Sequence, residues 1–395
     1  MRKIAANYIV PINGEPIKNG YIKIDDNGVI IEIGSLDKEC EDTEFYNGVL
    51  CPGFINAHCH IELSHLKGYF KEATGMSGFI NQINELRLTV GKEERLAALN
   101  VQMKQLYAQG VSGMGDISNC SESFEAKKNS QIITRTYLEL FGSEPKDATE
   151  VLNSGKELEK VAKEYGIDGA IAPHSCYTMS PELLANAAHE GLKSGYISYH
   201  NQESPEEEDL VIRGTGALAE NYKGRGLSTP PVTGKSALIY FIDRVLSLSA
   251  SPVKGRILLV HNVVTNKESI DYAKKHLENT YWAICPLSNI FIHRQLPPLD
   301  LMREENLKIC VGTDSLSSNK ILSIAEEIKS IQTNFPNIPL TEILTWCTQN
   351  GAEAIGAEKR LGSFEVGKKP GIVLIENVDL INFKLTSESI SRRLV

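Results

Sequence analysis

The sequence predicts an α/β protein, a (β/α)8 barrel flanked by a small β-sandwich domain built from both ends of the chain. Three observations predict it. Short apolar strands alternate with helical segments over about 300 residues after position 50, near the usual size of such a barrel. Ionisable side chains follow several of these strands, and barrel enzymes place their chemistry at that rim. Short strands with glycine-containing turns occupy both termini.

The composition is that of an ordinary soluble protein. The chain has 395 residues, enough for one large and one smaller domain, with 42% hydrophobic and 23% charged residues. A net charge of −9 without a Lys/Arg cluster argues against nucleic-acid binding. No apolar run approaches the roughly 18 to 20 residues of a membrane span, and the N-terminus does not resemble a signal peptide. Eight cysteines without CxxC pairs predict reduced thiols, and hence a cytoplasmic protein: Cys40, Cys51, Cys59, Cys120, Cys176, Cys285, Cys310 and Cys347.

The two ends of the chain predict one small domain. Glycine-containing turns separate three strands within residues 1–50: Lys3–Val10, Tyr21–Ile24 and Val29–Ile33. Residues 359–395 begin with further short strands between glycines. Neither segment is long enough to bury a core alone. We therefore expect a composite β-sandwich of 1–50 and 359–395, with the barrel at 51–358.

The middle of the chain predicts eight strands and the helices between them. The strands are Val49–Ala57, Ser112–Ile117, Ile132–Leu138, Asp168–Pro173, Tyr196–His200, Arg256–His261, Trp282–Cys285 and Ile309–Asp314. The helices are Glu93–Gln109, Asn153–Tyr165, Pro181–Ser194, Ser236–Leu246 and Lys267–His276. A doubly wound sheet is the alternative, but it does not explain why ionisable residues stand where the strands stop.

Two histidines end the first barrel strand, in FINAHCH. Side chains i and i+2 of a strand share a face, so His58 and His60 point at one place, as a divalent metal ion requires. Alone, this short and common pattern is more typical of two histidines in a loop. What favours a metal site is that four other strand ends carry an ionisable residue: His174, His200, His261 and Asp314.

A metal site follows from these residues. His58, His60, His200 and Asp314 supply three neutral nitrogens and one carboxylate. This set suits Zn²⁺, or another borderline ion such as Fe²⁺, and leaves a position for water, whose pKa the metal lowers to about 7.

Two more residues are candidates for catalysis beside the metal. Glu203 follows His200 by three residues and is expected to shuttle protons. The alternative is an exposed loop acid. His261 ends an apolar strand, where a histidine is often structural. Beside a metal it is expected to polarise the substrate or help activate water.

Several segments, in order, resemble the amidohydrolase superfamily: PGFINAHCH, PHSCYTMSPELL, HNQES, LVHN, CPLSN and VGTDSLSSN. The similarity is to the branch of guanine, cytosine, adenosine-type and S-adenosylhomocysteine/methylthioadenosine deaminases and triazine chlorohydrolases. The segment from Thr348 to Glu376 resembles that branch's closing segment, although Gly371 stands where Asp is frequent. The resemblance implies a metal-dependent barrel that hydrolyses at a heterocycle carbon. It also implies residue roles: ligands His58, His60, His200 and Asp314, catalytic Glu203, His261 and Asp314, and substrate contact His174.

The resemblance also narrows the reaction. Dinuclear members carry a carboxylated lysine at the end of the fourth strand, and no lysine occurs from Asp168 to Cys176. One ion per subunit is therefore expected. Mononuclear members with a glutamate after the third histidine most often catalyse deamination. We expect water to attack an amino-bearing ring carbon while Glu203 protonates the ring nitrogen and then the departing ammonia.

The substrate is a small heterocycle whose identity stays open at this point. Glu62 and Arg135 are candidate contacts for a polar ring edge or a carboxylate, with a salt bridge in the barrel wall as the alternative. His293 is a further candidate. The continuation HxHxELS resembles aminodeoxyfutalosine deaminases, which act on an amino-purine nucleoside bearing a benzoate. Guanine, 8-oxoguanine and methylthioadenosine-type substrates are alternatives.

One long insertion, 204–254, is expected to be a loop that closes over the substrate and sets specificity. Its acidic run, 206–209, is expected to be a solvated loop or a helix start rather than a ligand cluster. Two other functions are considered. One is hydrolysis of a chloro-heterocycle or cyclic amidine. The other is a non-catalytic metal-binding relative, which the retention of Glu203 disfavours. A homodimer without nucleic-acid or membrane partners is expected by resemblance.

Overall fold

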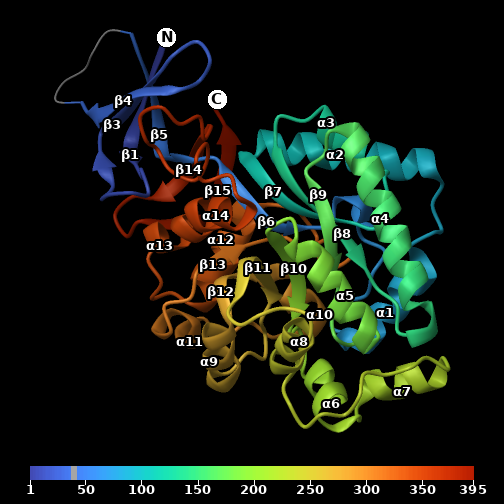
Figure 1. The fold of residues 1–395 in the computed structure, drawn as a ribbon. Coiled ribbons are helices and arrows are strands. Elements are labelled where there is room, and N and C mark those ends of the chain that lie inside the picture. The colour runs from blue at the N-terminus through green and yellow to red at the C-terminus, as the bar shows by residue number, and fades with distance from the viewer. Residues whose placement is uncertain (37–41) are drawn as a thin grey trace.

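The computed structural model describes residues 1–36 and 42–395, and the predicted reduced thiol Cys40 lies outside them. A sheet containing both termini lies at one end, and a larger body of strands surrounded by helices forms the rest (Figure 1).

Strands from both ends of the chain form the small domain, as predicted. The order is β15-β14-β5-β1-β3-β4, with β2 on β1. The bounds are β1 Arg2–Ile9, β2 Ile17–Lys18, β3 Gly20–Ile24, β4 Ile30–Ser35, β5 Thr43–Pro52, β14 Ile372–Asp379 and β15 Lys384–Arg393.

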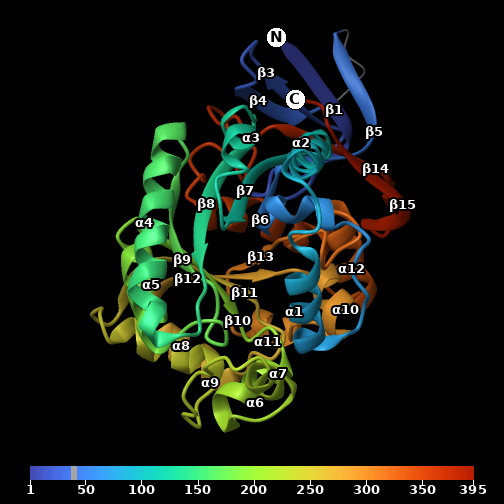
Figure 2. The ribbon, with the colours of Figure 1, turned by 90° about the vertical axis from the view of Figure 1, so that its right-hand side faces the viewer.

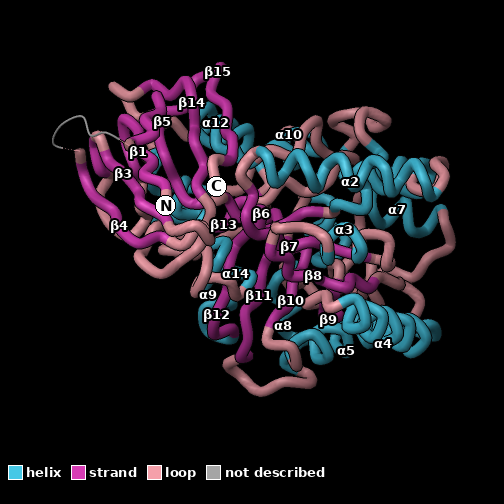
Figure 3. The backbone as a smooth tube through the Cα atoms, turned by 90° about the horizontal axis from the view of Figure 1, so that it is seen from above, coloured by secondary structure: helices cyan, strands magenta, loops and turns pink. Residues whose placement is uncertain are grey.

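The described strands form one seven-stranded sheet in place of the two sheets expected of a sandwich. The length of β5 explains the difference. Residues 43–50 of β5 pair in parallel with β1, while residues 49–52 pair antiparallel with β14 on the other edge. One strand therefore joins the N-terminal and C-terminal strands, and β5 lies between β1 and β14 in Figure 3. Apolar residues of both ends pack together on it: Ile4, Ile22, Leu50, Ile372 and Leu374.

The strand predicted at 49–57 is two strands. β5 ends at Pro52, and β6 (Phe54–Cys59) begins the barrel. Gly53 lies between them, where the chain passes from the sheet into the barrel. A Cβ at Gly53 would lie 1.9 Å from the Ser112 hydroxyl and 2.5 Å from the Pro370 carbonyl oxygen. Only glycine fits this close approach.

Eight parallel strands form the barrel in two sheets of four. They are β6, β7 Val111–Ser118, β8 Ile133–Leu140, β9 Gly169–Pro173, β10 Tyr196–Asn201, β11 Val253–His261, β12 Leu277–Ile284 and β13 Ile309–Val311. Hydrogen bonds join the two sheets at both edges. The amide of His200 donates to the His174 carbonyl oxygen (2.8 Å), and the Asp314 amide donates to the His58 carbonyl oxygen (3.1 Å). The predicted (β/α)8 ring is thereby closed.

Helices surround the strands, and all five predicted helices are present. The α-helices are α1 Gly75–Leu86, α2 Lys92–Ala108, α3 Phe124–Lys128, α4 Ala148–Tyr165, α5 Pro181–Leu192, α6 Pro205–Arg213, α7 Ala217–Gly224, α8 Ala237–Leu246, α9 Lys267–His276, α10 Pro286–His293, α11 Leu299–Glu304, α12 Ile324–Asn334, α13 Leu340–Thr345 and α14 Gly351–Ile355. Short 3₁₀ turns η1 and η2 cover Ile61–Leu66 and Pro145–Asp147, and a π-helical turn, η3, covers Trp346–Asn350. Within the described residues, every helix is too short or too polar to cross a membrane.

The insertion 204–254 is largely helical, not a single long loop. It contains α6, α7 and α8. Ser204 begins α6 by accepting a hydrogen bond from the Glu207 amide, and Pro205 occupies the first turn, both typical of a helix start. α6 and α7 lie at the end of the barrel away from the small sheet (Figures 1 and 2).

Candidate active site

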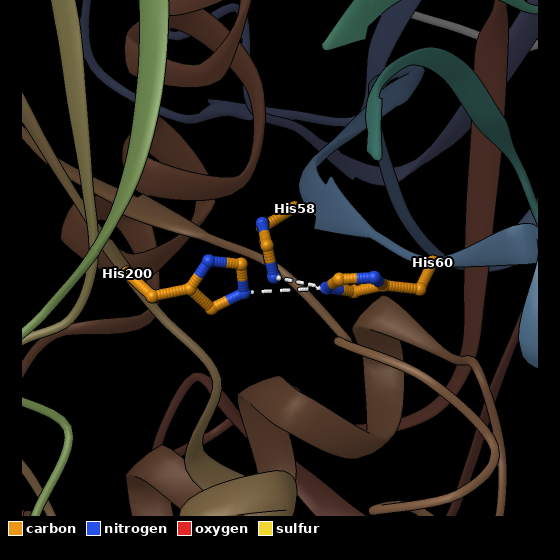
Figure 4. A group of neighbouring side chains, drawn as sticks. All are labelled: His58, His60 and His200. Atoms are coloured by element: carbon orange, nitrogen blue, oxygen red, sulfur yellow. Dashed lines mark hydrogen bonds between the residues drawn. The ribbon is translucent and has the colours of Figure 1, made fainter. Parts of the chain in front are cut away.

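The four predicted metal ligands meet at the carboxyl ends of the barrel strands. His58 is in β6, His60 follows it, and His200 is in β10. The Nε2 atom of His60 lies 3.2 Å from that of His58 and 3.3 Å from that of His200 (Figure 4). Asp314 Oδ1 lies 3.8 Å and 3.6 Å from the Nε2 atoms of His58 and His60. Four potential ligand atoms therefore face one point.

The protonation of these groups suits a cation. Burial, the largest cause, lowers the pKa of all three imidazoles and keeps them neutral at pH 7. Burial alone would raise the pKa of Asp314, but its surroundings, including hydrogen bonds from the Ser288 and Ser318 hydroxyls, hold the pKa below its ordinary value and keep the carboxylate ionised. Three neutral nitrogens and one carboxylate fit a borderline divalent metal ion, so the residues present can hold one.

The surrounding chain fixes the orientation of Asp314. The hydroxyls of Ser288 and Ser318 donate to Oδ2 at 2.6 Å and 2.7 Å, which leaves Oδ1 facing the histidines. Asp314 has a φ of +56° and His261 a φ of +76°. Non-glycine residues rarely adopt this left-handed conformation, and where it persists it is concentrated at functional sites.

Glu203 and His261 lie beside this cluster. The Glu203 amide donates to Glu207 Oε2 (2.6 Å), and the Tyr177 hydroxyl donates to Glu203 Oε2 (3.3 Å). His261 Nε2 lies 3.5 Å from Glu203 Oε1. The Asn289 amide nitrogen, which only donates, lies 3.1 Å from His261 Nδ1. Nδ1 therefore accepts, and neutral His261 carries its proton on Nε2.

The electrostatics of this pair suit proton transfer. Burial, followed by the nearby Asp314 and Glu207 carboxylates, raises the pKa of Glu203 well above its ordinary value. Burial lowers the pKa of His261 to about 4. Near pH 7 a carboxyl group able to carry a proton therefore lies next to a neutral imidazole.

A cavity of about 320 Å³ opens above the cluster. Its floor contains six of the predicted site residues: His60, His174, His200, Glu203, His261 and Asp314. Its wall is formed largely by α1 and the two residues that follow, with the apolar side chains Met76, Phe79, Ile80, Ile83 and Leu88. Volume and lining are those of a small-molecule site.

The insertion 204–254, expected to close over the substrate, lies behind the cavity wall in this structure. No residue of that insertion is among the residues that line the cavity; α1 occupies its place. α6 and α7 pack behind α1 instead, where Leu210, Leu218 and Tyr222 form a buried cluster with Met76. The insertion therefore supports the pocket from behind, through α1 and through the hydrogen bond from the Glu203 amide to Glu207.

The acidic run begins α6, the second of the two expected alternatives, and it is not a solvated loop because it satisfies backbone donors. Both carboxylate oxygens of Glu206 accept from the first amides of α1, those of Met76 and Ser77, at 2.9 Å. Glu207 is fully buried, and Glu208 accepts from the amide of Ala237 at 3.1 Å. Helix starts leave unpaired amides, and these carboxylates supply the acceptors.

Residues 49–390 match the amidohydrolase family. The chain belongs to that family. The family expected from the sequence segments is thus confirmed. The cluster of histidines and Asp314 lies at the carboxyl ends of the barrel strands of this amidohydrolase.

Three curated relatives of this amidohydrolase are deaminases. An adenosine deaminase of Helicobacter pylori is 29% identical over 354 residues, 87% of this chain and 82% of that protein. An aminodeoxyfutalosine deaminase of Nitratiruptor sp. is 26% identical, covering 84% and 79%. A 5-methylthioadenosine/S-adenosylhomocysteine deaminase of Bacillus cereus is 25% identical, covering 93% and 83%.

Solved structures share the fold. The crystal structure of Helicobacter pylori aminofutalosine deaminase in complex with methylthio-coformycin superposes with a TM-score of 0.80 at 24% identity, over 98% of this chain and 94% of that one. An adenosine deaminase from Xanthomonas campestris with bound zinc gives a TM-score of 0.70 at 18% identity, over 96% and 85%.

Of the four predicted substrate contacts, only His174 lines the cavity. Its ring stacks on that of His200 with centroids 4.3 Å apart, and its Nδ1 lies 2.8 Å and 2.9 Å from the hydroxyls of Ser175 and Thr178. Burial lowers the pKa of His174 to about 3, so the ring is neutral.

The prediction for Arg135 is wrong. Its Nη1 lies 2.5 Å from Asp168 Oδ1, and its guanidinium lies 3.8 Å from the centre of the Tyr196 ring. These contacts are near the amino end of β8, because the strand continues to Leu140 beyond the end assumed from the sequence. Arg135 is the barrel-wall salt bridge that stood as the alternative.

Glu62 and His293 also lie off the cavity lining. Glu62 Oε2 accepts a hydrogen bond from the backbone amide of Asn119 at 2.9 Å, and burial raises the pKa of the Glu62 carboxyl group. It therefore supports a loop behind the site. His293 ends α10, and none of the cavity-lining residues comes from that helix.

Most other lining residues were not singled out from the sequence, and three of them bear on the site: Arg87, Asn119 and Glu139. Glu139 is buried one residue before the end of β8, so it carries the same signal as the histidines, an ionisable residue at a strand end. Burial raises its pKa to about 8. Arg87 and Asn119 lie in loops and carry no such signal.

Proposed function

We propose that this amidohydrolase is a hydrolytic deaminase that releases ammonia from an adenosine-type nucleoside, with one Zn²⁺ per subunit and Fe²⁺ as the alternative ion. The observation that carries the proposal is the convergence of three neutral imidazoles and the ionised Asp314 next to buried Glu203, on the floor of the cavity. The deaminase names of the three relatives support the same reaction.

The residues around the cluster have distinct tasks in this reaction. A divalent metal ion held here supplies Lewis acidity, which lowers the pKa of water. Asp314 is oriented by two serine hydroxyls to accept a proton from the attacking water. Glu203 gives its proton to the ring nitrogen and regains one from the hydroxyl group added to the reacting carbon as the oxo product forms. The proton that Asp314 took from water passes to the departing amino group, which leaves as ammonia. His261 donates from Nε2 to the oxygen that develops charge at the reacting carbon.

The cavity favours a nucleoside with a large anionic substituent on its sugar. The apolar face of α1 leaves room for an aromatic or thioether group. Arg87 is the one Lys or Arg among the cavity-lining residues that the structure describes, and its polar side-chain contact is the Asn119 amide oxygen, at 2.9 Å. Its charge is therefore available to a substrate carboxylate. Aminodeoxyfutalosine has this chemistry.

Ammonia release by the zinc-reconstituted protein tests the proposal. The substrates are adenosine, methylthioadenosine, S-adenosylhomocysteine, aminodeoxyfutalosine, guanine, 8-oxoguanine and cytosine. We expect the largest kcat/KM with aminodeoxyfutalosine and measurable turnover of the other adenosine-type compounds. Turnover of guanine or cytosine alone would contradict the nucleoside class. If the zinc-loaded protein released no ammonia from any substrate of the panel, deamination would be contradicted.

Two further expectations belong to this proposal. Seven described cysteines are free, six of them buried, which supports a reducing, cytoplasmic compartment. A homodimer is proposed from the resemblance, and sedimentation equilibrium of the zinc-loaded protein tests it. A single species with the 43.6 kDa mass of one chain would contradict the dimer.

A further inference from the structure

We propose that Glu139 is a positioning residue for the metal ligand His200, and that Asn119 and Arg87 hold Glu139 in place. The proposal rests on the metal site of the proposed function. It goes beyond that site because it assigns a role to three residues that are neither ligands nor proton donors in the reaction.

The geometry around His200 carries the first step. Its Nε2 faces the other ligand atoms, so a metal bound there leaves the proton on Nδ1. Nδ1 is buried and has no hydrogen-bond partner among the described residues, and Glu139 Oε1 lies at an ion-pair distance of 3.3 Å from it. A metal-bound histidine commonly donates its second N–H to a carboxylate, which fixes the ring orientation and raises its basicity. Glu139 is placed to be that acceptor.

Asn119 carries the second step. Its amide nitrogen lies 3.2 Å from Glu139 Oε2 and 3.1 Å from the Glu139 carbonyl oxygen. Its amide oxygen accepts from Arg87 Nη2 at 2.9 Å. Because a guanidinium only donates, the oxygen must face Arg87 and the nitrogen must face Glu139. Arg87 therefore sets the orientation in which Asn119 restrains the carboxyl group.

The connected side chains join two parts of the site. Arg87 directly follows α1, Glu139 lies at the end of β8, and His200 lies in β10. Glu139, His174 and His200 also bring three potential ligand atoms within 4.8 Å of one another, so a second metal ion is the competing interpretation of the same carboxyl group. The two interpretations predict different metal stoichiometries.

Metal binding without substrate tests the proposal. Zinc affinity is measured by competition with a chromophoric chelator, and ligand geometry by the visible absorption of the Co²⁺-substituted protein. We expect Glu139→Ala to weaken zinc binding by about 10- to 100-fold and to shift the Co²⁺ bands. Asn119→Ala should act in the same direction by less. The double variant should match Glu139→Ala, because Asn119 acts through Glu139.

A conservative variant and a control complete the experiment. In Glu139→Gln the amide must present its N–H₂ group to either His200 or Asn119, both of which already donate, so an intermediate loss of affinity is expected. Asn84→Ala changes another cavity-lining residue of α1 and should leave zinc affinity and the Co²⁺ spectrum unchanged. Thermal unfolding shows that each variant is folded. If the alanine variant is not, the glutamine variant decides.

Each contrary result has a distinct meaning. Zinc affinity within twofold of wild type, an unchanged Co²⁺ spectrum and a raised KM would make Glu139 a substrate contact and overturn the proposal. Two zinc ions per wild-type chain, one of them lost in Glu139→Ala, would establish the second metal site instead. A wild-type chain that binds no zinc would overturn the metal site of the proposed function itself.

Discussion

The floor and the wall of the cavity are built in different ways. The floor consists of ionisable residues at strand ends, held by hydrogen bonds that also close the barrel, such as that from the Asp314 amide to the His58 carbonyl oxygen. The wall is a helix, α1, held by apolar packing against α6 and α7 and by one carboxylate, Glu206. The difference indicates that the floor determines the reaction and the wall determines which molecule undergoes it.

Glu203→Gln is expected to have the largest effect, because it removes the proton shuttle of the floor. Turnover should fall by about 10²- to 10⁴-fold with every substrate, while zinc content stays at one ion per chain. Ammonia release and elemental analysis measure the two quantities. Glu150→Gln, on the exposed surface of α4, is the matched control. Near-wild-type turnover in Glu203→Gln would refute the mechanism.

Asp314→Asn should damage metal retention and catalysis together. The asparagine amide lacks the charge of the carboxylate. Its nitrogen, which cannot accept a hydrogen bond, would face either the donating hydroxyls of Ser288 and Ser318 or the metal site. We expect at least about a 10-fold loss of zinc affinity together with a loss of turnover. Zinc retained after dialysis against a chelator measures the first quantity, with exposed Asp300→Asn as the control. Full zinc retention would remove Asp314 from the ligand set.

Arg87→Met tests mainly the wall, with only a weak effect on the floor expected through Asn119. For a nucleoside bearing a carboxylate, kcat/KM should fall by about 10- to 100-fold, because the variant loses a hydrogen bond between charged groups. For methylthioadenosine it should change by less than about threefold. Arg135→Met is the control, because that guanidinium already pairs with Asp168 outside the cavity. Equal losses with all substrates would place Arg87 with the floor and break the distinction between the two regions.

Glu207→Gln should change how stability depends on pH. Burial, the largest cause, raises the pKa of Glu207 to about 8 in the folded protein, above its unfolded value of about 4.5. The folded state therefore holds this proton more tightly, and the free energy of unfolding falls as pH rises from about 4.5 to about 8. In the glutamine variant, the free energy of unfolding should fall less over this pH range than in the wild type, by about 2 kcal/mol or more.

Urea unfolding of wild type and variant at pH 5 and pH 8 measures this difference. Glu327, also buried with a pKa raised to about 8, keeps its own contribution in both proteins and serves as the internal reference. Equal pH dependence in the two proteins would show that Glu207 is ionised throughout this range.

Glu206→Gln should have the smallest effect and should be confined to the wall. The variant loses the charge that caps α1, which costs about 0.5 to 1 kcal/mol of stability. KM should rise a few-fold with little change in kcat, because the floor is untouched. Exposed Glu220→Gln on α7 is the control. A loss of kcat equal to that of a floor variant would show that α1 is part of the catalytic machinery.

The same contrast explains what the sequence could predict. The metal cluster was predictable because strand ends meet at one rim, and His58, His60, His200 and Asp314 each end a recognisable apolar run. Glu139 carried that signal too and was overlooked. Arg135 was misplaced because it lies near the amino end of β8, whereas the cavity opens at the carboxyl ends of the strands.

The wall was not predictable in this way. The α1 residues are ordinary apolar side chains whose position depends on packing against α6 and α7, far away in the sequence. The acidic run looked solvated because its partners are backbone amides of α1 and α8, which no local pattern reveals. The spacing of motifs predicts the metal and catalytic residues, whereas the shape of a pocket depends on tertiary contacts.

The position of β5 has a consequence for synthesis on the ribosome. Its second edge pairs with β14, which follows it by roughly 300 residues, so at about 5 to 20 residues per second that edge stays uncovered for some 15 to 60 seconds. An open strand edge invites pairing with other nascent chains. Recombinant yield should therefore depend on translation speed and chaperone supply more than on the equilibrium stability of the finished molecule.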